Sequence, residues 1–160
     1  FFKALSDGMN RKAQGYAREI LRNVKDLPEG TEAAISFAID GSLKHVFTGT
    51  GPDMSVAIRG MQHPYVLLHN HASNDILSPE DILALIRHDN MVAIGAVGNK
   101  GALFTCEKVF GYSREKAVSF YQSILGQYPE MHVNLEQRVQ FMQSFMKGAE
   151  KYGLHFSSPG

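Results

Sequence analysis

The chain has 160 residues and a mass of 17.7 kDa, which suits one compact domain and excludes two large ones. Its composition, with 44% hydrophobic and 20% charged residues, is typical of a globular protein rather than a disordered one. Sixteen basic residues balance sixteen acidic ones without a run of like charge, so we do not expect a nucleic-acid-binding protein.

The first predicted element is an amphipathic helix over about residues 10–25, within an N-terminal segment of residues 1–31. Arg and Lys lie on one face, and apolar residues recur at helical spacing on the other: Ala13, Ala17, Ile20, Leu21 and Val24. The helix ends at Pro28 and Gly30, because proline lacks the amide donor that a helix needs and glycine allows a sharp turn.

A strand and a hairpin are predicted next. Residues 32–39 alternate between a face of larger apolar side chains, such as Phe37, and a face of small or polar ones. This alternation predicts a half-buried strand. Asp40-Gly41 is typical of a hairpin turn, so residues 45–48 are expected to return beside the first strand.

The middle of the chain combines a buried strand with a well-marked helix start. Residues 65–68 form a short, continuous apolar run, which favours a central strand covered on both faces and places His69 at its carboxyl end. Residues 78–81 read Ser-Pro-Glu-Asp, with Ser78 as the N-cap, proline in the first helical position and acidic groups in the first turn. We therefore expect a loop between the strand and a helix that begins near Pro79.

The second half of the chain predicts another hairpin and two helices. Residues 91–97 and 102–105 are expected to be strands joined by a glycine-rich turn. Residues 113–125 and 134–152 have the pattern of helices, and residues 157–160 are expected to form a tail. No internal repeat or linker divides the sequence.

Together these elements predict a single α/β (α+β) domain in which helices flank a mixed β-sheet. Its core would span residues 32–110, with the helices of residues 111–156 packed on it. Cys106 lies in an apolar stretch, so we interpret it as a core residue rather than a nucleophile. One cysteine, and no apolar run or leader suited to a bilayer, lead us to expect a cytoplasmic protein without membrane contact.

His69 and His71 are the first candidate metal ligands. One residue separates them at the end of a strand, so both side chains point to the same side and can reach one cation. Asp81 adds a carboxylate from the first turn of the next helix. Two imidazoles and one carboxylate leave a fourth position for water, as in catalytic zinc sites. The nitrogen ligands favour zinc over magnesium, whereas the spacing leaves iron, cobalt and manganese open.

Two further residues are candidates for the chemistry beside the metal. Glu32 lies on the small-residue face of its strand and is the best candidate for the general base, although a solvated strand-end carboxylate is an equal alternative. Ser78 can cap the helix, or it can donate a hydrogen bond to a substrate oxygen. The remaining histidines have no partner at ligand spacing and are expected to be surface or core residues: His45, His63, His88, His132 and His155.

The order and spacing of these five residues resemble a known family. His69-x-His71, six residues, Ser78, two residues and Asp81 resemble the metal-binding core of the JAMM (MPN-plus, Mov34/PAD-like) zinc metalloproteases, with Glu32 in the place of their catalytic glutamate. The style of the motif is closer to prokaryotic, phage-associated and RadC-like relatives than to eukaryotic deubiquitinases. Many relatives have proline where Ala72 stands, a difference that removes no ligand.

The resemblance implies a cytidine-deaminase-like JAMM/MPN architecture and a zinc-dependent hydrolase that cleaves a peptide or isopeptide bond in a protein or peptide substrate. It implies that His69, His71 and Asp81 hold Zn²⁺. By the same resemblance, Glu32 acts as general base and acid, and Ser78 helps to stabilise the tetrahedral intermediate.

The alternative is a non-catalytic metal-binding or assembly module of RadC-like or phage-associated type, in which the metal is structural. Cleavage specific to ubiquitin has little support, because residues 81–110 are compact and lack the insertions that deubiquitinases use to hold ubiquitin. The terminal helices could complete the core, or they could contact a partner or a second copy of the chain.

Overall fold

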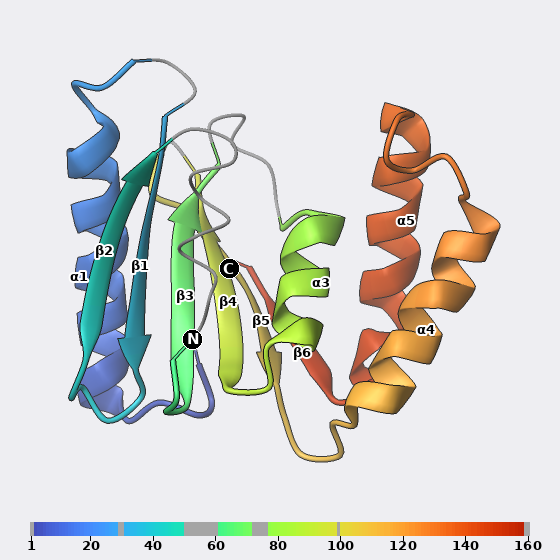
Figure 1. Ribbon diagram of the computed structural model, residues 1–160, viewed down its shortest axis with the longest axis horizontal. Coiled ribbons are helices and arrows are strands. Elements are labelled where there is room, and N and C mark those ends of the chain that lie inside the picture. The colour runs from blue at the N-terminus through green and yellow to red at the C-terminus, as the bar shows by residue number, and fades with distance from the viewer. Residues whose placement is uncertain (1, 29–30, 50–60, 72–76, 99, 159–160) are drawn as a thin grey trace.

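The computed structural model describes residues 2–28, 31–49, 61–71, 77–98 and 100–158. Figure 1 shows how its helices and strands follow one another. In chain order they are α1 (Asp7–Val24), β1 (Glu32–Ala38), β2 (Lys44–Gly49), β3 (Tyr65–Asn70), α3 (Pro79–Arg87), β4 (Met91–Val97), β5 (Leu103–Lys108), α4 (Arg114–Gln127), α5 (Leu135–Gly148), the 3-10 helix η1 (Ala149–Tyr152) and β6 (Leu154–Ser157).

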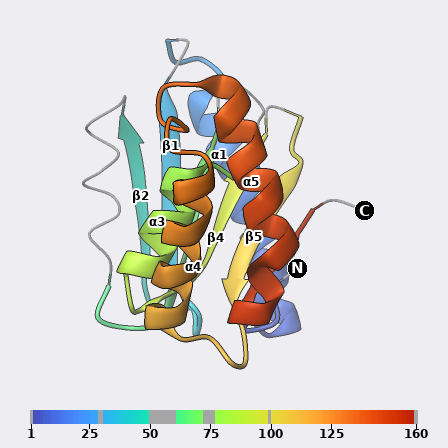
Figure 2. The same cartoon turned by 90° about the vertical axis from the view of Figure 1, so that its right-hand side faces the viewer.

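Six strands form one sheet in the order β2-β1-β3-β4-β5-β6. β3 and β4 are parallel, and every other neighbouring pair is antiparallel. α3 lies in the crossover between the two parallel strands, because parallel neighbours need a long connection. α1 covers one face of the sheet, and α3, α4 and α5 lie on the other side (Figure 1; Figure 2). The structure therefore confirms the predicted single α+β domain with a mixed sheet flanked by helices.

Each face of the sheet buries its own hydrophobic cluster. On the α1 side, Ile20 packs with Phe37 and Leu68. On the other side, Phe141 of α5 belongs to the cluster that contains Cys106. Cys106 is fully buried, and this burial raises the pKa of its thiol, which confirms its interpretation as a core residue. Among the described residues, no helix is both long enough and apolar enough to cross a membrane.

β1 is buried on both faces, so the prediction of a half-buried strand is wrong. Phe37 packs in the α1 cluster, while Ala34 packs in the cluster on the α3 side. Ser36, on the same face as Ala34, is only 3% exposed. The small side chains on this face are therefore buried instead of bordering open space. Glu32, the first residue of β1, is half-buried and borders a pocket.

The sequence pattern does not reveal β6, which pairs antiparallel with β5. β6 follows a turn at Gly153, where φ is 76° and an added Cβ would lie 2.4 Å from the backbone nitrogen of Tyr112, so glycine is required there. β6 includes Ser157, which the predicted tail had contained. The last α-helix ends at Gly148, earlier than predicted, and η1 takes up residues 149–152.

Candidate metal centre

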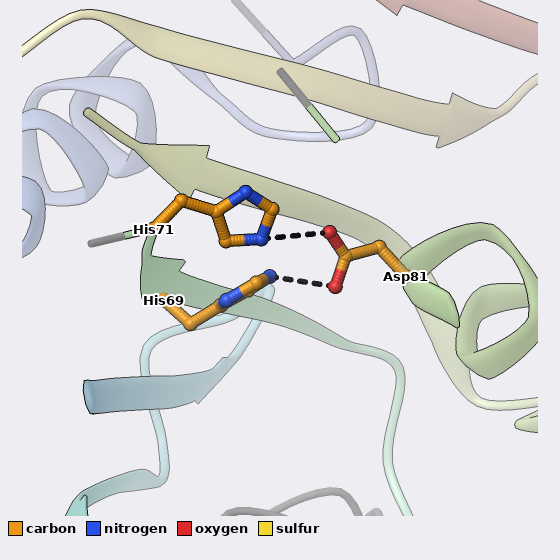
Figure 3. A group of neighbouring side chains, drawn as sticks. All are labelled: His69, His71 and Asp81. Carbon is orange, nitrogen blue, oxygen red and sulfur yellow. Dashed lines mark ion pairs between the residues drawn. The ribbon is translucent and has the colours of Figure 1, made fainter. Parts of the chain in front are cut away.

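Two histidines at the end of β3 point to one side of the sheet, and Asn70, which lies between them in the chain, points to the other. The side-chain oxygen of Asn70 accepts a hydrogen bond from the backbone amide of Ala33 at 2.7 Å. Its side-chain nitrogen donates to the carbonyl of Thr31 at 3.4 Å. These bonds fix the alternation along β3, so that His69 and His71 both face α3 (Figure 3). Asn70 thus ties the end of β3 to the start of β1, a contact that sequence reasoning passed over.

A capping box at the start of α3 orients the carboxylate of Asp81. The hydroxyl of Ser78 accepts a hydrogen bond from the Asp81 amide at 3.2 Å, and Asp81 Oδ2 accepts one from the Ser78 amide at 2.9 Å. The two hydrogen bonds form a capping box, in which the side chain of each residue bonds to the backbone amide of the other. Ser78 thus has the capping role that the sequence predicted, and Asp81 is held at the helix N-terminus with its side chain turned toward β3.

The two imidazoles and the carboxylate converge, as Figure 3 shows. Asp81 Oδ1 lies 2.9 Å from His69 Nε2, and Asp81 Oδ2 lies 3.0 Å from His71 Nε2. His69 and Asp81 are 8% and 9% exposed. One ligand atom from each of the three residues lies within 4.8 Å of the other two, so the group could hold a metal ion. The structure thus brings together the three metal ligands that the sequence predicted.

The geometry around His69 fits a cation better than a direct hydrogen bond. His69 Nε2 is buried and has no assigned hydrogen bond among the described residues, although an Asp81 oxygen lies 2.9 Å away. An unpaired buried nitrogen is costly, whereas a metal ion would satisfy it. Ligand atoms around a tetrahedral zinc lie about 3.3 Å apart when the bonds are about 2.0 Å long, and the two nitrogen–oxygen distances here are 2.9 and 3.0 Å.

The charges in this group shift two pKa values in opposite directions. Burial disfavours the charged form of His69, but the adjacent Asp81 carboxylate more than offsets burial, so the pKa of His69 is raised. Burial likewise opposes ionisation of Asp81, but the two histidines hold the pKa of its carboxyl well below its usual range. In the absence of metal, the Asp81 carboxylate therefore favours the protonated form of His69.

Raising the pH is expected to lower the stability of the metal-free protein and to raise that of the zinc-loaded protein. The raised pKa of His69 stabilises the metal-free protein below the unfolded pKa of about 6.5, and this stabilisation is lost as the pH rises through the folded pKa. Zinc needs the neutral ring, so its affinity rises with pH over the same range. The depressed pKa of Asp81 contributes stability that is fully present above about pH 4 and is lost only in acid, so it stays constant over this range. Thermal unfolding of both forms between about pH 5 and 9 measures the difference, and parallel profiles would contradict the prediction.

Glu32 lies on the side of the sheet that carries the two histidines. β1 pairs antiparallel with β3, and Ala34 is directly opposite His69. Glu32 is two residues from Ala34, so it lies on the same face of the sheet as Ala34 and His69. Glu32, His69 and His71 line one pocket of about 600 Å³. The negative charge of Glu32 also contributes to the raised pKa of His69. The predicted general base is thus in the same pocket as the predicted metal ligands.

A wall of this pocket comes from α5, which sequence reasoning did not assign to the site. Leu135, Val139 and Met142 line the pocket at positions i, i+4 and i+7 of the helix. Arg138 on the same helix donates from both terminal nitrogens to the Glu80 carboxylate of α3, at 2.9 and 2.6 Å. This bidentate pair ties α5 to the helix that carries Asp81. The helical spacing of apolar residues along α5 was visible in the sequence. The same spacing is found in helices that pack against a core, so it did not indicate a pocket.

Replacing Ser78 with alanine is expected to lower the free energy of unfolding by about 1 kcal/mol, because the cap of α3 is lost. It should also weaken zinc binding several-fold, since the Asp81 carboxylate loses the hydroxyl that orders its turn. Ser113 caps α4 in the same way, through Lys116, so Ser113→Ala is the matched control. Urea denaturation and zinc titration of both variants measure the two effects. Equal zinc affinities in both variants would show that the cap does not position Asp81.

No further metal-binding group of three His, Cys, Asp or Glu residues occurs in the ranges that the structure describes. Ala72, the position at which many relatives of the resembled family have proline, lies outside those ranges, as do Ser73 and Asp75. No protein-family model matches the chain, and no curated protein or solved structure is significantly similar to it. The resemblance to JAMM metalloproteases therefore stays a prediction that depends on the motif residues.

Proposed function

We propose that the chain is a zinc-dependent hydrolase that cleaves a peptide or isopeptide bond with an activated water molecule. The observation that carries the proposal is the convergence of His69, His71 and Asp81 at one edge of a pocket that Glu32 also lines. Three ligands leave a coordination position for water, and a neighbouring carboxylate that is not among them can act as a base. Zinc is proposed over other metals because two of the ligands are imidazoles.

The residues of the chain have distinct roles in this proposal. When bound, zinc supplies Lewis acidity, which lowers the pKa of water and polarises a carbonyl group. Glu32 takes the proton of the attacking water and returns it to the leaving amine. The Ser78 oxygen accepts a hydrogen bond from the Asp81 amide, so its own hydroxyl proton is still available. Ser78 donates this proton in a hydrogen bond to the negative charge that develops on the substrate oxygen. Asn70 keeps both histidines turned to the site.

Metal removal and restoration test the proposal. The zinc-loaded protein is expected to cleave members of a mixed peptide library, detected by mass spectrometry of new amino termini. Treatment with a chelator should abolish the cleavage, and stoichiometric zinc should restore it, because the water is activated only beside the metal. Cleavage that persists at the same rate after complete removal of the metal would contradict the proposal.

A further inference from the structure

The α5 wall of the pocket exposes apolar side chains beside the candidate metal centre. Among the described residues, seven large hydrophobic side chains are exposed, and three of them are clustered within seven positions at the start of α5. Leu135 is 76% exposed and Val139 is 49% exposed, and both line the metal pocket. Val133 is 85% exposed but does not line it. Apolar groups that border a polar site in this way commonly bind an apolar part of a ligand.

The charges near this wall are already paired with one another. Both terminal nitrogens of Arg138 face the Glu80 carboxylate, and His132 lies 3.8 Å from the same carboxylate. The guanidinium is thus engaged in a bidentate pair instead of being presented to a substrate carboxylate. A charged substrate group on the wall would lose water without gaining an opposite charge, whereas an apolar group would gain from burial.

We propose that Leu135 and Val139 form a specificity subsite that binds the apolar side chain of the substrate residue next to the cleaved bond. The inference rests on the proposed zinc hydrolase, because the metal centre is what fixes the cleaved bond beside α5. Continuity supports it: the histidines, Asp81 and the two apolar residues line the same pocket. A leucine-sized side chain covered on one side by this wall is expected to bind about tenfold more tightly than no side chain.

Amino-acid hydroxamates test the subsite without requiring turnover. A hydroxamate chelates zinc through its two oxygens and places a chosen side chain beside the metal. Calorimetry of the zinc-loaded protein should show leucine hydroxamate binding about tenfold more tightly than glycine hydroxamate, and aspartate hydroxamate without that gain. The double variant Leu135→Ser/Val139→Ser should reduce the leucine preference to less than about twofold. Val133→Ser, an exposed position outside the pocket, should leave the preference unchanged.

The possible outcomes separate the subsite from the metal centre. If glycine hydroxamate binds but leucine hydroxamate binds no better, the subsite is wrong and the zinc centre stands. If neither compound binds to a protein loaded with zinc, the proposed function fails, and the subsite fails with it. The subsite would also be overturned if Val133→Ser lost the preference for leucine hydroxamate as fully as the double variant does. Val133 does not line the pocket, so the preference would then not come from direct contact with Leu135 and Val139.

Discussion

Replacing Asp81 with asparagine is expected to weaken zinc binding by at least about 100-fold, a larger loss than removing a residue that merely supports a ligand. Asparagine has nearly the same shape as aspartate and keeps one side-chain oxygen that can accept the hydrogen bond from the Ser78 amide. The first turn of α3 should therefore stay capped. It lacks the negative charge that faces both histidines in the pocket. Without that charge the pKa of His69 should also fall, because its main raising influence is removed.

Competition with a chromophoric chelator at neutral pH measures this affinity. Asp89→Asn provides the control, because Asp89 is an exposed carboxylate paired with Arg114 outside the pocket. Circular dichroism of both variants checks that the fold is retained. Wild-type zinc affinity in Asp81→Asn would exclude the carboxylate as a ligand and would reduce the centre to its two histidines.

Replacing Glu32 with glutamine should retain zinc but lower kcat by about 100- to 10,000-fold, the usual contribution of a general acid-base residue. Glutamine occupies the same volume and cannot take a proton from water. Glu32 is not one of the three converging ligand residues, so the zinc dissociation constant should change by less than about threefold. The loss should appear in kcat rather than in KM, since the carboxylate acts on the reacting water.

Peptide turnover and zinc titration must be measured on the same preparation of Glu32→Gln. Glu115→Gln, in the first turn of α4, controls for the loss of an exposed carboxylate. Zinc retained with full turnover would show that Glu32 is a strand-end carboxylate without a chemical role. Loss of both zinc and turnover would instead make it a metal ligand.

The sequence predicted which three residues would converge because they are close in the chain and the directions of their side chains are set locally. His69 and His71 share a side by strand alternation, and Asp81 lies in a helix whose start is marked by Ser78. The structure brings these residues together, with Asp81 Oδ1 2.9 Å from His69 Nε2. Glu32 could also be placed on the correct face, because the face of a strand follows from its alternation.

The features that the sequence did not reveal depend on contacts between distant segments. Whether Leu135 and Val139 face the core or a pocket depends on how α5 sits against α3, which the Glu80–Arg138 pair helps to set across 58 positions. Helical spacing is the same in both cases. β1 was predicted half-buried because the alternation of larger and small side chains does not show whether the small-residue face is also covered. β6 has four residues, too few for a pattern to stand out.

Anomalous diffraction from crystals of the zinc-loaded protein would locate the metal and all of its ligands. The expected result is one zinc ion about 2.0–2.2 Å from a nitrogen of His69, a nitrogen of His71 and an oxygen of Asp81, with a water ligand on the side of Glu32. Zinc absent from this position, or a fourth protein ligand that closes the coordination sphere, would contradict a hydrolytic centre.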